Sequence, residues 1–200
     1  MEQETQIQQD VELLKRRLTS LPQPVVRPYL ILVSGLPGTG KSYVSRRLAE
    51  RLPIAVLETD ALRKTLFPTP VYTADESARL FQASHLLIEE LLRKGIPVLL
   101  DATNLVERHR EYLYSIAERL KAKLLIVLVT APAEQVRERL AHRSPHPDGD
   151  INSDADWQVY QRMRASVDTI SRNHLVADTS KDVTPVIDKV VREVKRWGKI

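Results

Sequence analysis

The sequence predicts an α/β fold built on a doubly wound, mostly parallel sheet. Short apolar segments alternate along the chain with longer segments in which apolar residues recur at helical spacing. A glycine-rich loop joins the first apolar segment to the helix after it, an arrangement typical of ligand-binding parallel sheets. Two hundred residues suffice for one domain with a substantial core.

A polar segment precedes the first predicted strand. A helix is expected over residues 3–19, ending before the break at Pro22, and it carries four apolar residues at helical spacing: Ile7, Val11, Leu14 and Leu18. We therefore assign residues 1–26 to an amphipathic helix and linker, and residues 27–200 to the domain proper. The helix either covers the back of the sheet, the interpretation favoured here, or serves as a docking or regulatory arm.

Five apolar segments are candidates for the strands: 29–34, 54–57, 96–100, 124–129 and 174–177. The first is an unbroken apolar run of the kind that forms a buried parallel strand. The helices are expected at 42–52, 74–94, 106–121, 132–142, 155–171 and 182–197. The one long polar stretch, 142–156, is rich in Pro, Asp, Ser and Gly, and loops of that length often act as lids. A lid over about 137–156 is predicted.

Residues 35–42 match the phosphate-binding pattern G-x-x-x-x-G-K-[ST] at every fixed position, between a predicted strand and a predicted helix. Glycines allow consecutive backbone N–H groups to surround phosphate oxygens, and the helix N-terminus adds its positive dipole end. Lys41 is expected to reach the β- and γ-phosphates of ATP, and the Ser42 hydroxyl to ligate Mg²⁺. The residues expected to contact the nucleotide are Gly35, Pro37, Gly38, Thr39, Gly40, Lys41, Ser42 and Tyr43.

Polar residues follow the third predicted strand, at the edge where an open parallel sheet binds its ligand. Asp101 comes after four apolar residues and fits the carboxylate that holds the Mg²⁺ shell beside Ser42. Capping of the next helix is the alternative role for Asp101. Thr103 and Asn104 either cap that helix or contact the phosphate acceptor, and capping is the simpler interpretation.

Asp60 lies at the end of the second predicted strand, where its carboxylate would face the γ-phosphate. A kinase needs such a base to take the proton of an acceptor hydroxyl, whereas a hydrolysing ATPase needs a group that orients water. Arg63, one helical turn later, could clamp an anionic acceptor. An N-capping Asp60 with an incidental surface Arg63 fits the spacing equally well.

Two arginines stand four residues apart at the start of the predicted lid. Arg139 and Arg143 would project on one face of a helix. Arginine at this place can neutralise charge on a transferring phosphoryl group as a lid closes, which would give both a catalytic role beside Lys41. A solvated basic face is the alternative, and the spacing alone favours it.

These motifs resemble those of the P-loop kinases related to polynucleotide 5′-kinases and to zeta-toxin-like predicted ATP-dependent kinases. Asp60 and Arg63 fit the D-x-x-R element of that group, and residues 101–104 are similar to its D-A-T-N stretch. Arg139 and Arg143 fit its R-x-x-x-R lid element. The resemblance implies a three-layer P-loop NTPase fold with five parallel strands in the order 2-3-1-4-5 and a lid. It also implies that Asp60 is a general base and that Arg63 contacts the substrate phosphate.

Composition bounds the remaining choices. The chain is 42% apolar and 28% charged, as soluble globular proteins are, and the lack of cysteine excludes disulfides and thiolate metal sites. No apolar run is long enough for a membrane span, and the polar start does not resemble a signal peptide. A cytoplasmic location without a membrane partner is therefore expected. The net charge of +4 permits a nucleic-acid partner without requiring one.

The leading functional interpretation is an enzyme, an ATP-dependent phosphotransferase that moves the γ-phosphate of ATP to a hydroxyl. The favoured acceptor is the 5′-OH of RNA or DNA. A kinase acting on a sugar, an antibiotic or a nucleotide precursor is the alternative. A nucleotide-driven switch ATPase, with the N-terminal helix engaging a partner, belongs to a different class. Asp60 distinguishes the classes, because a switch has no need of an acceptor base.

Overall fold

The structure is a computed structural model that describes residues 2–18, 20–103, 106–142 and 155–199. Its centre is a sheet of five parallel strands in the order β2-β3-β1-β4-β5. The strands are β1 (Tyr29–Ser34), β2 (Ala55–Glu58), β3 (Val98–Asp101), β4 (Lys123–Thr130) and β5 (Leu175–Asp178). Each predicted strand is present with small shifts at its ends, and the strand order implied by the family resemblance is confirmed.

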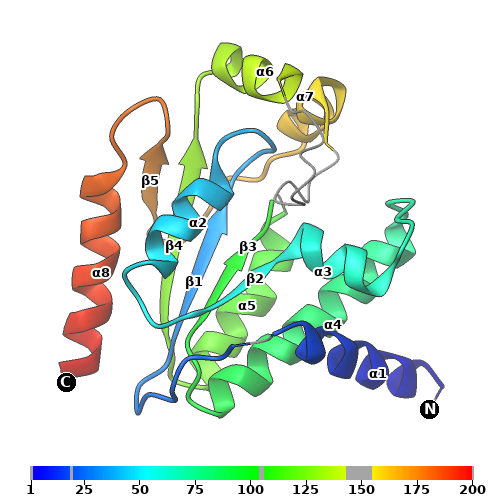
Figure 1. The fold of residues 1–200 in the computed structure, drawn as a ribbon, viewed down its shortest axis with the longest axis vertical. Coiled ribbons are helices and arrows are strands. Elements are labelled where there is room, and N and C mark those ends of the chain that lie inside the picture. Colours follow the sequence, from blue (N-terminus) through cyan, green and yellow to red (C-terminus); the bar gives the residue numbers. More distant parts are fainter. Residues whose placement is uncertain (1, 19, 104–105, 143–154, 200) are drawn as a thin grey trace.

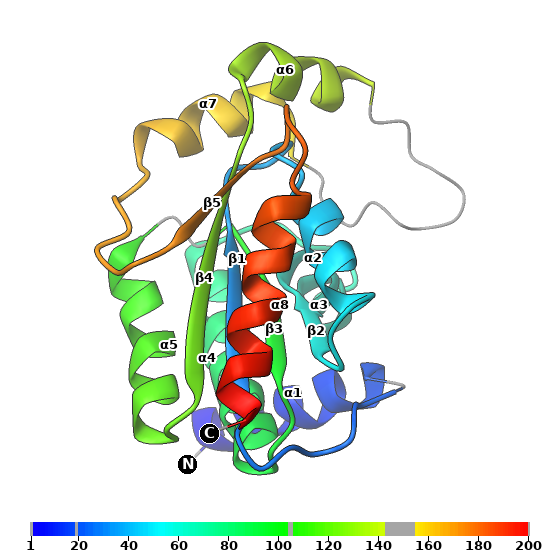
Figure 2. The same cartoon turned by 90° about the vertical axis from the view of Figure 1, so that its left-hand side faces the viewer.

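Helices cover both faces of the sheet (Figures 1 and 2). Ile31 and Val33 of β1 point to one face, and the helices packed there are α2 (Lys41–Ala49) and α8 (Thr184–Lys199). Leu30 and Leu32 point to the other face, where the helices are α3 (Thr59–Leu66), α4 (Ala74–Arg93) and α5 (Glu107–Arg119). This alternation follows from the pleat of a strand buried on both sides.

Two further helices lie over the carboxyl edge of the sheet (Figure 1): α6 (Ala133–Ala141) and α7 (Trp157–Ala165). Val136 and Leu140 of α6 form a small apolar cluster with Tyr160 of α7, and Leu36 of the phosphate loop packs against it. Most of the predicted lid, residues 143–154, lies outside the described residues. The two helices that flank this segment are thus anchored directly on the phosphate loop.

Two helices differ from those expected. α3 is not among the expected helices, because its eight residues are too few for a clear periodic pattern, and burial of its leucines in the core stabilises it instead. α7 ends at Ala165 rather than near residue 171. The backbone carbonyls of Asp168 and Thr169 instead accept hydrogen bonds from Arg110. Within the described ranges, no helix combines the length and the apolar character that a membrane crossing needs.

The N-terminal helix, α1 (Glu2–Arg17), packs against α4 and α3 rather than directly on the sheet. Val11 and Leu14 are fully buried and belong to the core on this side. Asp10 is 2% exposed, and its carboxylate accepts hydrogen bonds from Nε and Nη2 of Arg79 at 2.5 and 2.6 Å. The helix was expected to cover the sheet, but it covers the helical layer and contributes to the core.

The substitution Asp10→Ala is predicted to lower the free energy of unfolding by about 1.5–3 kcal/mol, because it removes charge-assisted hydrogen bonds from a buried carboxylate. Urea unfolding followed by circular dichroism measures this loss. As a control, Asp188→Ala removes an exposed ion pair with Arg51 and should cost less than about 1 kcal/mol. Equal effects of the two substitutions would show that the Asp10–Arg79 ion pair contributes no more to stability than an exposed one does.

Candidate functional site

The phosphate loop joins β1 to α2 at the centre of the sheet. Gly35 passes so close to β4 that a Cβ there would lie 2.4 Å from the carbonyl oxygen of Val129. Gly40, with a φ of 95°, lies in the left-handed region, and an added Cβ would meet Thr179 at 3.0 Å. Both positions therefore require glycine. Without side chains at these two positions, the loop can present backbone N–H groups to phosphate oxygens.

The carbonyl of Leu36 organises the inside of the loop. It accepts a hydrogen bond from Oγ1 of Thr39 at 2.8 Å and another from Nζ of Lys41 at 3.3 Å. Thr39 is buried, whereas Lys41 is half-buried. The hydrogen bond to Leu36 therefore keeps the Lys41 ammonium above the loop, at the place where the phosphates of a nucleotide would lie.

The other residues expected at the nucleotide lie around this loop. Pro37 and Gly38 are buried, and a Cβ at Gly38 would contact the side chains of α6. Ser42 and Tyr43 are exposed in the first turn of α2. The Tyr43 hydroxyl accepts a hydrogen bond from Arg47 at 3.0 Å. Ser42 is therefore open to a ligand and, as described next, adjacent to a carboxylate.

Asp101 ends β3 and is 4% exposed. The hydroxyl of Ser45 donates a hydrogen bond to its Oδ2 at 3.0 Å. Burial raises the pKa of the Asp101 carboxyl, while the Lys41 ammonium and the hydroxyls of Ser45 and Ser42 act in the opposite direction. α5 is preceded by Val106 as its cap, so Asp101 is not a helix cap. Lys41 and Ser42 lie close enough to act on the pKa of Asp101, and its role as a metal ligand stays a prediction.

The donor set at this point fits Mg²⁺. It consists of the Ser42 hydroxyl and the Asp101 carboxylate, which are hard oxygen ligands. No cluster of three or more His, Cys, Asp or Glu side chains able to hold a metal occurs in the described part of the chain. An ion here would therefore complete its shell with phosphate oxygens and water, as Mg²⁺ does in nucleotide sites. Its chemical contribution would be to offset negative charge on those phosphates.

Asp60 lies half-buried in the first turn of α3, one residue after Thr59, whose hydroxyl donates to the carbonyl of Asp101 at 3.3 Å. The end of β2 is thereby fastened to the end of β3. The residue before α3 is Glu58, so the alternative of Asp60 as its N-cap is wrong. Within the described ranges, no hydrogen bond engages the Asp60 carboxylate, so its oxygens can accept one from a ligand.

Arg63 is buried between α3 and α4 and is not an incidental surface residue. Its Nη2 donates a hydrogen bond to the Ser77 hydroxyl at 3.1 Å, and its Nη1 lies 3.5 Å from a Glu76 carboxylate oxygen. The guanidinium also stands 5.0 Å from the centre of the Tyr72 ring. Its Nη1 is buried and has no hydrogen-bond partner among the described residues, so this atom of Arg63 still lacks an acceptor.

Arg139 reaches from α6 down to the phosphate loop. Its Nη1 donates to the hydroxyl of Thr179 at 2.8 Å and approaches the carbonyl of Gly38 at 3.4 Å, while its Nη2 donates to the Thr179 carbonyl at 3.1 Å. It is therefore not part of a solvated basic face. Arg143, the predicted partner of Arg139 in the lid, lies outside the described residues. The catalytic role of Arg143 therefore stays a prediction.

Thr103 follows β3 beside the phosphate loop. Its carbonyl accepts a hydrogen bond from the Ser34 hydroxyl at 3.1 Å and one from the backbone N–H of Gly35 at 3.4 Å. Because Val106 precedes α5, the capping role favoured for Thr103 is wrong. Asn104, predicted with it to contact the acceptor or to cap, lies outside the described residues.

Residues 30–170, which include the phosphate loop, match the AAA domain family. The chain belongs to this family. It is 32% identical over 149 residues to the UPF0200 protein of Aeropyrum pernix, a match that spans 68% of this chain and 73% of that protein.

The fold of this AAA domain protein is shared with solved P-loop kinases. A gluconokinase from Sinorhizobium meliloti 1021 matches with a TM-score of 0.60 and 22% identity, over 86% of this chain and 94% of that one. The APS kinase CysC of Mycobacterium tuberculosis, solved with AMPPNP and APS, matches with a TM-score of 0.59 and 21% identity. That match covers 89% of this chain and 100% of the other. These similarities support a P-loop kinase fold without singling out polynucleotide kinases.

Two residues of the candidate site were not predicted from the sequence. Ser45 holds the Asp101 carboxylate, and Thr179 donates from its hydroxyl to the carbonyl of Thr39 at 2.7 Å while it binds Arg139. Ser45 follows Ser42 by three residues, so its place on the same side of α2 could have been recognised. Thr179 has no such local signal, because its partners lie 40 and 140 residues away in the chain.

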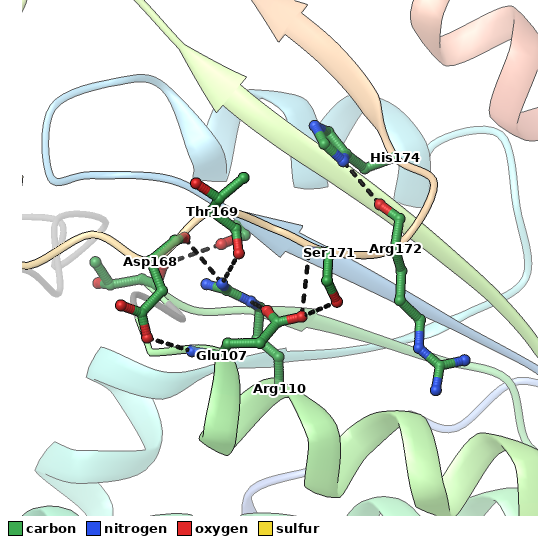
Figure 3. A network of polar contacts seen from close by, with 9 residues as sticks. Glu107, Arg110, Asp168, Thr169, Ser171, Arg172 and His174 are labelled. Atoms are coloured by element: carbon green, nitrogen blue, oxygen red, sulfur yellow. Dashed lines mark hydrogen bonds and ion pairs between the residues drawn. The ribbon is translucent and has the colours of Figure 1, made fainter.

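A third unpredicted element is the polar network at the start of α5 (Figure 3). Arg110 is 1% exposed, and its Nε donates to a carboxylate oxygen of Glu107 at 2.5 Å. Its Nη2 donates to the carbonyls of Asp168 and Thr169 at 2.9 and 3.0 Å. The side chain of Asp168 in turn accepts the backbone N–H of Glu107 at 2.9 Å. This network fastens the segment after α7 to the helix that follows β3.

The substitution Asp101→Asn is predicted to abolish the Mg²⁺ dependence of ADP binding while leaving the melting temperature unchanged or raised. Burial disfavours the charged carboxylate, and asparagine keeps an oxygen for Ser45, so the ligand-free fold should not suffer. Calorimetric titration with ADP, with and without Mg²⁺, and thermal melts measure the two effects. Asp75→Asn, at an exposed position of α4, is the control. A large fall in melting temperature with intact Mg²⁺ dependence would make Asp101 a structural residue.

Proposed function

We propose that this protein is an ATP-dependent phosphotransferase that moves the γ-phosphoryl group of ATP to an acceptor hydroxyl. The observation that carries the proposal is the meeting of Lys41, Ser42 and the buried Asp101 carboxylate at one phosphate loop. Asp60 stands at the end of the adjacent strand pair, where a base for the acceptor would be needed. Similarity to P-loop kinase structures supports the same reaction class.

Each residue has a defined task in this proposal. The acceptor oxygen forms a bond to the γ-phosphorus while the bond from phosphorus to the bridging oxygen of ADP breaks. The Asp60 carboxylate takes the hydroxyl proton. Lys41 and Arg139, with Arg143 of the lid, offset negative charge on the transferring group. Ser42 and Asp101 would hold Mg²⁺, as the donor set described above allows.

A small-molecule acceptor fits the proposed reaction as well as the 5′-OH of RNA or DNA does. The polynucleotide proposal relies on Arg63 to hold an acceptor phosphate. Arg63 faces Glu76 and Ser77 inside the fold, but its Nη1 has no hydrogen-bond partner there. The gluconokinase and the APS kinase with this fold are named for small acceptors. The polynucleotide alternative makes its own prediction, which is oligonucleotide phosphorylation that weakens as salt rises.

A nucleotide-driven switch ATPase fits less well. That interpretation assigns α1 to partner binding, yet Val11, Leu14 and Asp10 of α1 are buried within this chain. It also gives no task to the Asp60 carboxylate. The kinase interpretation accounts for both observations. In it, α1 stabilises the fold and Asp60 takes the proton of the acceptor hydroxyl.

The substitution Asp60→Asn is predicted to lower phosphoryl transfer by about 10²–10⁴-fold while Mg·AMPPNP affinity is kept, because the change removes a general base and leaves the phosphate loop intact. The measurement is transfer from γ-labelled ATP to a panel of small hydroxyl compounds and 5′-OH oligonucleotides, with calorimetry for AMPPNP. Lys41→Ala, by contrast, should abolish detectable transfer, since its charge sits on the phosphates. Normal turnover by the Asp60→Asn protein, or loss of its AMPPNP binding, would remove Asp60 from the mechanism.

A further inference from the structure

A cavity of about 340 Å³ lies beside the phosphate loop, on the face of the sheet opposite α2. One wall is formed by the carboxyl ends of β1 and β4. The other wall is formed by Tyr160 of α7 and by the residues that follow α7, 167–170. Part of this second wall is visible in Figure 3, where Asp168 and Thr169 stand over Arg110. The volume is that of a small-molecule site.

Two residues connect this cavity with the predicted site of phosphoryl transfer. Leu36 lines the cavity, and its carbonyl is the group that holds the Lys41 ammonium at 3.3 Å. Thr103, which follows the strand that ends in Asp101, lines it as well. A molecule in the cavity would therefore lie directly against the loop that holds the phosphates of ATP.

The lining of the cavity is mainly apolar. Its apolar side chains include Leu128, Val129, Tyr160, Val167 and Ile170. The basic side chains among the described lining residues are Arg110 and His174, and both have partners. Arg110 binds the Glu107 carboxylate and two backbone carbonyls, and Nδ1 of His174 lies 2.9 Å from the carbonyl of Arg172. Away from the phosphate loop, an anion entering the cavity would lose hydration, and the described lining residues would offer it no further cation and one carboxylate, that of Asp168.

We propose that this cavity binds the acceptor, and that the acceptor is a neutral hydroxyl compound with one apolar face, no larger than a nucleoside. The proposal rests on the proposed phosphotransferase function and names its substrate class. The apolar face would pack on Tyr160 and Ile170. Thr103, Thr130 and Thr169 also line the cavity, and their hydroxyls could orient polar edges of the acceptor.

The structure contains a natural reporter for occupancy of the cavity. The ring of Trp157 stacks on Tyr160, with ring centres 4.9 Å apart and planes inclined by 17°. The only other tryptophan, Trp197, lies in α8 on the far face of the sheet. In a Trp197→Phe protein, fluorescence therefore reports on the environment of Trp157 alone.

The experiment titrates the Trp197→Phe protein, saturated with Mg·AMPPNP, with two matched pairs of compounds. These are thymidine with thymidine 3′-monophosphate, and phenyl glucoside with phenyl glucuronide; in each pair the second member adds a negative charge. At least one neutral member should change Trp157 fluorescence, and its charged partner should bind at least about tenfold more weakly, which corresponds to about 1.4 kcal/mol. Val167→Phe should weaken the neutral ligand, because Val167 lines the cavity at its exposed side. Val26→Phe, at a fully exposed linker position, is the matched control.

Tighter binding of the charged partners would overturn the proposal, as would the absence of a response to both neutral compounds. An unchanged response in the Val167→Phe protein would overturn it as well, because the ligand would then lie elsewhere. Failure of the phosphotransferase function would look different. In that case a neutral compound would bind in the cavity of the Trp197→Phe protein and change the Trp157 fluorescence as expected. No phosphate would be transferred from ATP to that compound. Lys41→Ala should reproduce this pattern, with binding kept and transfer lost.

Discussion

The hydrogen bond from Ser45 of α2 to the buried side chain of Asp101 is the interaction that positions the phosphate loop, and an asparagine oxygen would preserve it. Asp101 is 4% exposed, and a charge in such a place needs compensating groups around it. The hydroxyl of Ser45 and the ammonium of Lys41 provide them, and both belong to α2. The position of α2 is thereby tied to the end of β3. The loop that leads from β1 into α2 then lies over the carboxyl edge of the sheet, with Ser42 beside the carboxylate.

Two arginines, each bonded to a distant segment of the chain, stabilise the carboxyl edge of the sheet on either side of the phosphate loop. On one side, Arg139 of α6 binds Thr179, which in turn binds the carbonyl of Thr39 in the phosphate loop. On the other side, Arg110 of α5 holds the segment after α7 through backbone carbonyls. A nucleotide would therefore meet groups from α2, α6 and the end of β5. In our proposal, an acceptor would occupy the cavity between the sheet and α7, one wall of which is held by the Arg110 network.

The sheet and the phosphate loop could be predicted because their signals are local. Buried parallel strands are continuous apolar runs, and the loop needs glycine where Gly35 passes Val129 and where Gly40 begins α2. The meeting of Asp101 with Ser42 followed from the rule that parallel strands end at one edge. The surroundings of Arg63 could not be predicted, since Glu76 and Ser77 reach it from another helix.

The early end of α7 could not be predicted either, because it also depends on contacts with a distant part of the chain. The periodic pattern continues past Ala165, but the carbonyls that would continue the helix bind Arg110, which lies 58 and 59 residues earlier in the chain. Thr179 is a similar case, because a threonine after a strand carries no sign that it will bridge two loops. Local periodicity predicts which segments form elements, whereas long-range hydrogen bonds decide where they stop and which side chains meet.

The most direct test of the central claim is ³¹P NMR of the protein during turnover of Mg·ATP in the presence of the neutral hydroxyl compound that fills the cavity. Transfer to a hydroxyl predicts that the ATP resonances are replaced by those of ADP and of a new phosphomonoester, in equal amounts. The Asp60→Asn protein should form the phosphomonoester far more slowly. Appearance of ADP with inorganic phosphate, and no phosphomonoester, would contradict the account and identify the protein as a hydrolysing ATPase.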